Sequence, residues 1–198
     1  MGRPRTGTHA VPTVDRILQA AEDQFGEIGF GQCRLEDIAD VASIRRPSLL
    51  YHFSTKHKLY EAVVHRLFQA LMENLAEMAA VTDDYDQRVL GLMKTFLEFL
   101  EKRPAFAPLV LREIIDGTGP GREILLGVVV PVIDNIEVWL ASSAGDRAPE
   151  GFDFRGAIMQ VSSNALLRAS SGPLLTPLWG EQGDHLGLVK QVFFVVEN

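Results

Sequence analysis

The segment between Ser43 and Leu59 gathers side chains that can bind the phosphates and bases of a nucleic acid. It contains four Lys or Arg, two His and no Asp or Glu, although the 198-residue chain has a net charge of −7. Lysine and arginine neutralise phosphates, while hydroxyl and imidazole groups add hydrogen bonds to sugar–phosphate oxygens or base edges. The candidate residues for nucleic-acid binding are Arg45, Arg46, Pro47, Ser48, Tyr51, His52 and Lys56.

The charge of the chain is unevenly distributed. Residues 1–58 contain eight Lys or Arg and seven Asp or Glu, whereas residues 59–198 contain eleven and nineteen. An acidic remainder repels nucleic acid elsewhere on the molecule and so orients the approach of the basic segment. The negative total therefore does not argue against a nucleic-acid partner.

Two short helices are expected to position these side chains. Pro47 suits the first turn of the second helix, because its ring fixes φ and a helix start needs no N–H there. Two short helices joined by a tight turn, with cations on the second, are typical of a helix-turn-helix, whose second helix enters the DNA major groove. The first helix is indicated by apolar residues at helical spacing before a break at Ser43, namely Leu35, Ile38, Ala39 and Ala42.

Lys56 and Lys58 lie in the expected first turn of the next helix, for which Ser54 or Thr55 would be a suitable N-cap. The helix dipole disfavours a cation at that end by about a few tenths of a kcal/mol. Two solvated lysines would explain the pattern as well as a phosphate contact does. The neighbouring arginines favour the phosphate contact.

Three ordered groups of residues carry a resemblance to a known family. Their order and their spacing across three helices make it specific, and it covers about residues 13 to 65. These residues resemble the N-terminal domain of the TetR family of bacterial transcriptional regulators. The groups are Arg16-Ile17-Leu18 with Ala20-Ala21, Phe25 and Gly29-Phe30; Asp37-Ile38-Ala39; and Ser48-Leu49, Tyr51-His52-Phe53, Lys56 and Leu59.

The resemblance implies an all-α, one-component repressor of about nine helices. An N-terminal three-helix helix-turn-helix domain would bind DNA, and a helical C-terminal domain would bind a ligand and form the dimer. We expect a flexible arm at 1–12, the helix-turn-helix domain at 13–58 and the second domain at 59–198. By position, the family's recognition helix and the turn before it correspond to Arg45, Arg46, Ser48, Tyr51 and His52, and its phosphate-contacting lysine to Lys56.

The chain departs from the family pattern at three places. Cys33-Arg34 stands where members often have Thr or Ser opening the second helix, so Arg34 is expected to replace that phosphate contact. Leu50 stands where a Tyr is frequent, and Ser43 where a Gly is frequent. None of these changes threatens the fold.

The first residues, Gly2-Arg3-Pro4-Arg5, form a short basic segment. Arginine prefers the narrow, strongly negative minor groove of A·T-rich DNA, so Arg3 and Arg5 are candidates for a minor-groove arm. A solvated tail is the alternative, and the sequence leaves both open.

The second domain is expected to begin with a long helix. An apolar stripe from Leu59 to Met78 predicts one helix that runs from the first domain into the second. A later helix over 122–142 contains Pro131, whose ring clashes with the carbonyl of Gly127, so we predict a kink or local unwinding there. By the resemblance, that helix borders the ligand cavity. The stretch 174–180 is interpreted as an apolar loop.

The last two helices indicate a homodimer. The helix over 152–170 has small residues that allow close approach, and the last one, capped by Asp184, is apolar on nearly every side. Such a helix needs cover on both sides, which a four-helix bundle of two chains would provide. The alternative is burial within its own chain.

The expected ligand cavity is bordered by aromatic residues with a few polar ones. Each candidate has an alternative role in packing the core. The candidates are Phe96, Phe99, Phe106, Arg112, Trp139, Met159 and Asn164.

Signatures of catalysis and metal binding are not found in the sequence, so we expect neither an enzyme nor a cofactor or metal site. The single cysteine, Cys33, suits a cytoplasmic protein. No apolar run approaches the roughly 20 residues of a membrane span, the longest being 124–136, and no signal peptide is expected.

The expected function is that of a dimeric repressor, which a small apolar or amphiphilic effector releases from a pseudo-palindromic double-stranded DNA operator. The alternative is an all-α small-molecule-binding protein or enzyme with a vestigial DNA-binding domain. The cationic run between Arg45 and Lys58 argues against that alternative. An activator or an architectural DNA-binding protein is a third option.

Overall fold

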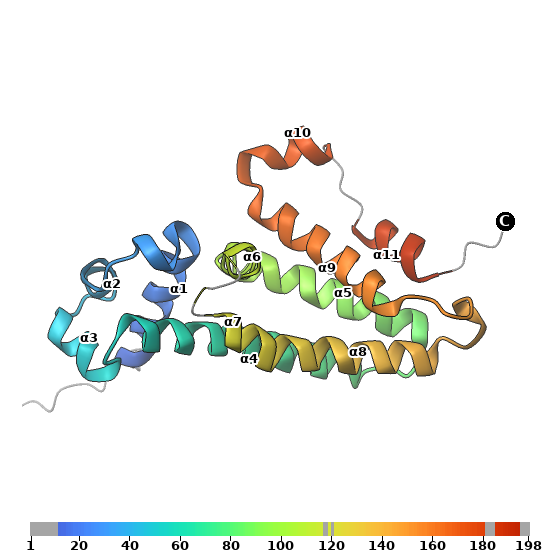
Figure 1. Ribbon diagram of the computed structural model, residues 1–198, viewed down its shortest axis with the longest axis horizontal. Coiled ribbons are helices and arrows are strands. Elements are labelled where there is room, and N and C mark those ends of the chain that lie inside the picture. The colour runs from blue at the N-terminus through green and yellow to red at the C-terminus, as the bar shows by residue number, and fades with distance from the viewer. Residues whose placement is uncertain (1–11, 117–118, 120, 181–184, 195–198) are drawn as a thin grey trace, which may run out of the picture. The chain divides into compact units, whose positions relative to one another are not determined.

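The computed structural model describes residues 12–116, 119, 121–180 and 185–194. These residues form helices and connecting turns, with no strand among them, which confirms the all-α class (Figure 1). The chain divides into two compact units, Met1–Val63 and Val64–Asn198. The division falls inside the long helix α4 (Lys56–Ala79), five residues beyond the end expected for the helix-turn-helix domain at residue 58.

The first unit contains α1 (Thr13–Gln32), α2 (Leu35–Val41), α3 (Arg46–His52) and the start of α4. Gly29 has φ 80° and ψ 165°, so the regular helical run of α1 ends there. The core is aromatic and aliphatic: the Tyr60 ring lies edge-on to Phe25, with 5.0 Å between centroids. The largest fully buried side chains also include Ile17, Ile38, Leu49 and Leu59.

The turn between α2 and α3 is a left-handed helix end. Ser43 has φ 55°, a conformation that glycine adopts without strain. The N–H of Ile44 donates to the carbonyl of Ala39 at 2.9 Å, and the N–H of Ser43 to the carbonyl of Asp40 at 3.0 Å. This pair of bonds is a Schellman motif. It explains why a glycine is frequent at this position, and it fixes the direction in which α3 leaves α2.

The second unit is a bundle in which α9 (Phe154–Ser170) is central. It packs against α5 (Tyr85–Lys102), α6 (Phe106–Asp116), α8 (Val130–Ser143) and α11 (His185–Phe193), and α11 also packs against α5. The remaining elements are α7 (Arg122–Ile124), a π-helical turn η1 (Leu125–Val129), α10 (Leu175–Trp179), and two 3-10 turns, η2 (Gly145–Arg147) and η3 (Gly172–Leu174).

The stretch predicted as a loop at 174–180 is instead helical, because η3 leads directly into α10. The flanking glycines and prolines had indicated a loop, yet Gly172 and Gly180 have positive φ and so bound the element rather than prevent it. Counting α7, η1 and α8 as one continuous helix gives ten α-helices in the described residues, against about nine expected.

The helix formed by α7, η1 and α8 is locally unwound, as Pro131 predicted. The π-helical turn Leu125–Val129 lies immediately before the proline and includes Gly127, whose carbonyl the ring would meet in a regular α-helix. By length and composition alone, the 22 residues Arg122–Ser143 would suffice to cross a membrane, contrary to the expectation that no run approaches that length. Several of its apolar side chains instead line a cavity of the second unit.

Candidate DNA-binding surface and ligand cavity

Helix α3 presents one face to the core and a polar face to solvent. Leu49 is fully buried, whereas the Tyr51 side chain is 85% exposed and lies edge-on to His52, with 5.3 Å between ring centroids. Arg45 is the N-cap, and the first turn of α3 contains no acid. The structure therefore brings together on one exposed surface Arg45, Arg46, Pro47, Ser48, Tyr51 and His52, which we call the α3 surface.

One acidic residue contacts the α3 surface. The Arg46 Nε lies 2.8 Å from the Glu36 Oε1 of α2, and both side chains are more than half exposed. An exposed ion pair is weak, so a phosphate can replace the carboxylate. The sequence pattern did not reveal this pair, because ten residues and the Schellman turn separate its members.

The ammonium group of Lys56 is bound within the protein. Its Nζ donates to the carbonyl of Phe30 at 2.7 Å and that of Cys33 at 3.1 Å, with a longer contact of 3.5 Å to Gly31, and it lies 4.4 Å from the centre of the Phe30 ring. These carbonyls follow the break at Gly29, where the helical hydrogen bonds of α1 stop. An ammonium has three donors. The donors of Lys56 thus point to the end of α1, and the contact of Lys56 with a phosphate stays a prediction.

The other cations of this unit are differently placed. Arg34 is exposed at the N-cap of α2 without a side-chain cap hydrogen bond, and its contact with a phosphate stays a prediction. Lys58 and His57 each lie 3.2 Å from the carboxylate of Glu61, and the hydrogen bond from Lys58 lowers the Glu61 pKa. Thr55 accepts from the N–H of Lys58 at 3.1 Å, so it caps α4. Arg3 and Arg5 lie outside the described residues.

A cavity of about 210 Å³ lies in the second unit. Helices α4, α5, α6, α8, α9 and α11 all contribute to its wall, and Ser162 of α9 is its one polar lining residue among those described. The apolar lining includes Phe68, Leu71 and Leu75 from α4, Met93 and Phe96 from α5, Phe106 and Val110 from α6, Val132, Ile133 and Ile136 from α8, Ile158 and Met159 from α9, and Val189 and Phe193 from α11.

Three of the seven residues predicted to line the cavity do so: Phe96, Phe106 and Met159. The other four lie outside the lining, and their contact with a ligand stays a prediction. Phe99 packs within the core, edge-on to Phe106 with 5.1 Å between centroids. Arg112 of α6 and Asn164 of α9 also lie outside the lining.

Trp139, the fourth, belongs to a stack of rings and cations at one end of the unit. Its ring stacks on Tyr85, with 5.8 Å between centroids. The guanidinium carbon of Arg88 lies 4.7 Å from the centre of the Trp139 ring, and that of Arg147 lies 5.6 Å from the centre of the Tyr85 ring. The stack joins the start of α5 to the end of α8. Burial raises the pKa of Tyr85, so its hydroxyl stays protonated.

Sequence reasoning missed the α8 wall, although its signal was present. Val129, Val132, Ile133, Ile136 and Leu140 repeat at i, i+3, i+4, i+7 and i+11 and all line the cavity. That spacing indicates one apolar face. The predicted lining was mainly aromatic, whereas this wall is a continuous aliphatic face.

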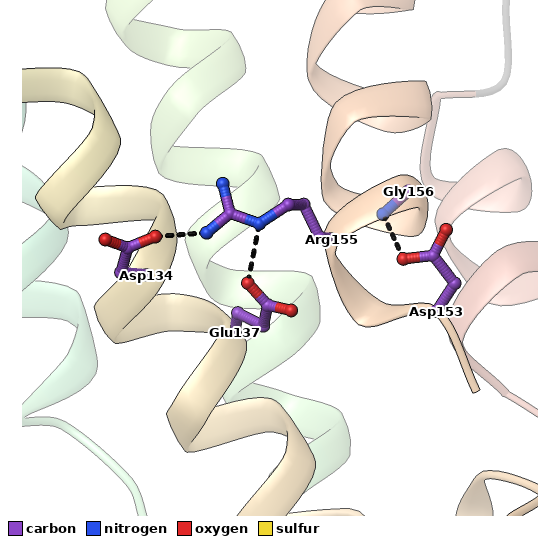
Figure 2. Close-up of polar contacts among 5 residues, drawn as sticks. All are labelled: Asp134, Glu137, Asp153, Arg155 and Gly156. Carbon is purple, nitrogen blue, oxygen red and sulfur yellow. Dashed lines mark hydrogen bonds and ion pairs between the residues drawn. The ribbon is translucent and has the colours of Figure 1, made fainter. Parts of the chain in front are cut away.

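Arg155 connects α8 to the first turn of α9 beside this wall. Figure 2 shows its guanidinium between two carboxylates of α8: it donates to Asp134, and its Nε donates to Glu137 at 2.8 Å. The hydrogen bond to Asp134 raises the pKa of Arg155, so the group remains charged. Asp153 accepts from the N–H of Gly156 at 2.8 Å and caps α9. These charges lie outside the cavity lining.

Comparisons with known proteins agree with this architecture. Residues 17–63 match the family model described as bacterial regulatory proteins, tetR family. The transcriptional regulator RutR of Escherichia coli K12 is 30% identical over 193 residues, which cover 92% of this chain and 84% of that protein. The transcriptional activator FasR of Mycolicibacterium smegmatis is 33% identical over 86 residues, 43% of this chain and 39% of that one.

Solved structures share the fold. The ketosteroid transcriptional regulator KstR2 of Mycobacterium tuberculosis superposes with a TM-score of 0.75 at 18% identity, covering 97% of this chain and all of that one. The fatty acid degradation regulator FadR of Bacillus halodurans superposes with a TM-score of 0.72 at 16% identity, covering 94% of this chain and 95% of that one. At these identities the likeness concerns the fold alone.

Proposed function

This chain belongs to the TetR family of bacterial transcriptional regulators, and we propose that it is a repressor which a small apolar molecule releases from a pseudo-palindromic DNA operator. The observation that carries the proposal is the pairing of two features in one chain. The α3 surface is exposed and cationic, and the second unit contains a partly open, almost wholly apolar cavity. The first suits DNA and the second suits an effector.

The α3 surface would read bases in the major groove. Arg46 and Tyr51 extend from successive turns of α3, and Ser48 and His52 lie beside them. Arg45 and Arg34 would contact phosphates, which position the helix but carry no sequence information. Arg3 and Arg5 are proposed as a minor-groove arm on the basis of sequence alone.

A homodimer would present two such helices to one operator. The support lies on α9 and α11, which leave apolar side chains exposed: Leu167 is 48% and Leu186 38% exposed. A second copy of the same two helices would cover them as a four-helix bundle. Two-fold symmetry then requires half-sites about 34–36 Å apart, or a multiple of that distance.

Helix α4 is the proposed link between effector and operator. It contributes Leu59 and Tyr60 to the core of the first unit, and it contributes Phe68, Leu71 and Leu75 to the cavity of the second. An effector that binds one placement of these cavity-lining side chains more tightly would shift the population toward it. The protein would act in the cytoplasm, where its operator lies.

The test begins with an operator selected from a pool of random duplexes. Replacement of Tyr51 or Arg46 by Ala should weaken binding to that operator by about tenfold to a hundredfold. Loss of the Arg46 charge should also lower the slope of log K against log salt by about one, whereas loss of the neutral Tyr51 should not. Arg147→Ala is the matched control, because Arg147 is an exposed, ion-paired arginine of the second unit. Unchanged affinity and slope in both variants would exclude α3 as the reading helix.

A further inference from the structure

We propose that the ligand of the cavity is a neutral, mainly hydrocarbon molecule of about eight to ten carbon atoms with one hydroxyl or carbonyl group, which Ser162 recognises. This inference rests on the proposed function, because it names the class of effector for the same cavity. It follows from three properties of the cavity: the charge of its lining, its volume and the placement of its one polar side chain.

The lining offers no partner for a charge. Among the described residues, those that line the cavity include no Asp, Glu, Lys, Arg or His. The charged cluster that joins α8 and α9 lies outside the lining and is already neutralised in part, since Arg155 donates to both Asp134 and Glu137. An ionised group placed in such a cavity would lose its hydration without compensation. The cavity therefore selects against carboxylates and amines.

The volume sets the size of the ligand. An apolar protein cavity of roughly 150 Å³ binds benzene, which has six carbon atoms. The present cavity has the same kind of lining and a volume of about 210 Å³, but it is partly open, so it should hold roughly eight to ten carbon atoms of the ligand. Both a medium-length chain and a small bicyclic ring system meet this limit.

Ser162 supplies the one polar contact. Its hydroxyl lies 3.5 Å from the carbonyl of Met159, one turn earlier on α9, which is longer than the usual 2.5–3.0 Å of a good O–H···O bond. The hydroxyl can therefore turn toward a ligand with little loss. Because it donates and accepts, it matches an alcohol, a ketone or an ester, but it cannot neutralise a charge.

Binding is measured by calorimetry on the full chain without DNA, using 1-hexanol, 1-octanol, 1-decanol, octanoate and octylamine. Affinity for the alcohols should rise about fourfold for each added methylene until the cavity is full. Octanoate and octylamine should bind at least about thirtyfold more weakly than 1-octanol. The apparent affinity of octanoate should rise by about tenfold for each unit of pH lowered, because the neutral acid is the form that binds, whereas that of 1-octanol should stay constant.

Variants separate the cavity from the rest of the surface. Val132→Phe places a larger side chain in the lining and should abolish binding, whereas Val138→Phe, on the same helix but 67% exposed, should leave it unchanged. Ser162→Ala should lower the affinity for 1-octanol by about tenfold and leave the affinity for octane unchanged. Ionised ligands that bind as tightly as the alcohol, or alcohols that fail to bind, would overturn the inference. Release of the operator is measured separately, so alcohols that bind without releasing DNA would refute the effector role alone.

Discussion

Replacement of Lys56 by methionine distinguishes a lysine that holds the first unit together from one that mainly contacts DNA. Methionine keeps most of the chain length and its contact with Phe30 but removes the charge and all three donors. In the structure those donors serve the carbonyls of Phe30 and Cys33, with a longer contact to Gly31. The variant would leave these carbonyls to water or without a partner.

The expected loss can be worked out from these contacts. A hydrogen bond from a charged donor contributes about 1.5–3 kcal/mol, and there are two of good length. The site is partly exposed, so water can hydrogen-bond to the carbonyls in the variant and reduce the loss. Removal of a cation from the first turn of α4 also stabilises that helix by about a few tenths of a kcal/mol. We therefore expect a net destabilisation of the first unit by about 2 kcal/mol. Opening of that unit would become roughly thirtyfold more frequent.

Amide hydrogen exchange of the full chain provides the assay. Peptides from α1, α2 and α3 should exchange roughly thirtyfold faster in Lys56→Met, while peptides from α5 and α9 keep their rates. Lys58→Met is the matched control, because Lys58 is exposed and contacts only Glu61 through its ammonium. Its exchange rates should stay within about threefold of the parent. Equal exchange in the two variants, together with a selective loss of operator affinity in Lys56→Met, would refute the structural role and restore the phosphate contact.

Three further predictions follow from local geometry. Glu36→Gln frees Arg46 from its ion pair and removes a charge that repels DNA, so the affinity for the operator at low salt should rise about threefold to tenfold. Fluorescence anisotropy titrations that give the same operator affinity for both proteins would contradict this. Burial raises the pKa of the Cys33 thiol to about 11, against the opposing charge of Lys56, so the folded state binds the proton more tightly than the unfolded state, whose value lies near 9.0. Stability should therefore fall as pH rises from about 9 to 11, and a thiol reagent should react at pH 8 only as fast as the unit opens. Gly127→Ala should stabilise the chain by about 0.5–1 kcal/mol, because the added Cβ meets nothing within 4 Å. Gly121→Ala should destabilise the chain, because its Cβ would lie 2.8 Å from the carboxylate carbon of the buried Glu113. Thermal unfolding measures both changes.

The helix-turn-helix could be predicted because its determinants are local. The break at Ser43, the proline at 47 and the apolar positions at 38 and 49 each specify a turn, a helix start or a buried face within a few residues. Helix boundaries and the buried faces of α2 and α3 therefore agree with the sequence pattern. The role of Lys56 was different: its acceptors lie 23 to 26 residues away, and no local rule connects them.

The ligand cavity shows why the remainder escaped prediction. Periodicity identifies which side chains of a helix point inward. Whether these side chains touch one another or border a cavity depends on how closely six helices pack together, which the pattern of one helix does not determine. Trp139 points to an aromatic partner, so it fills space that it had been expected to border. The α8 wall also ends at Val129 for a structural reason. A π-helical turn accommodates an extra residue and shifts the phase of the side chains before it, so Leu126, three residues earlier, is 53% exposed instead of continuing the wall. Pro131 itself does not line the cavity, and a Pro131→Ala chain that regained a regular α-helix should extend the wall by one turn.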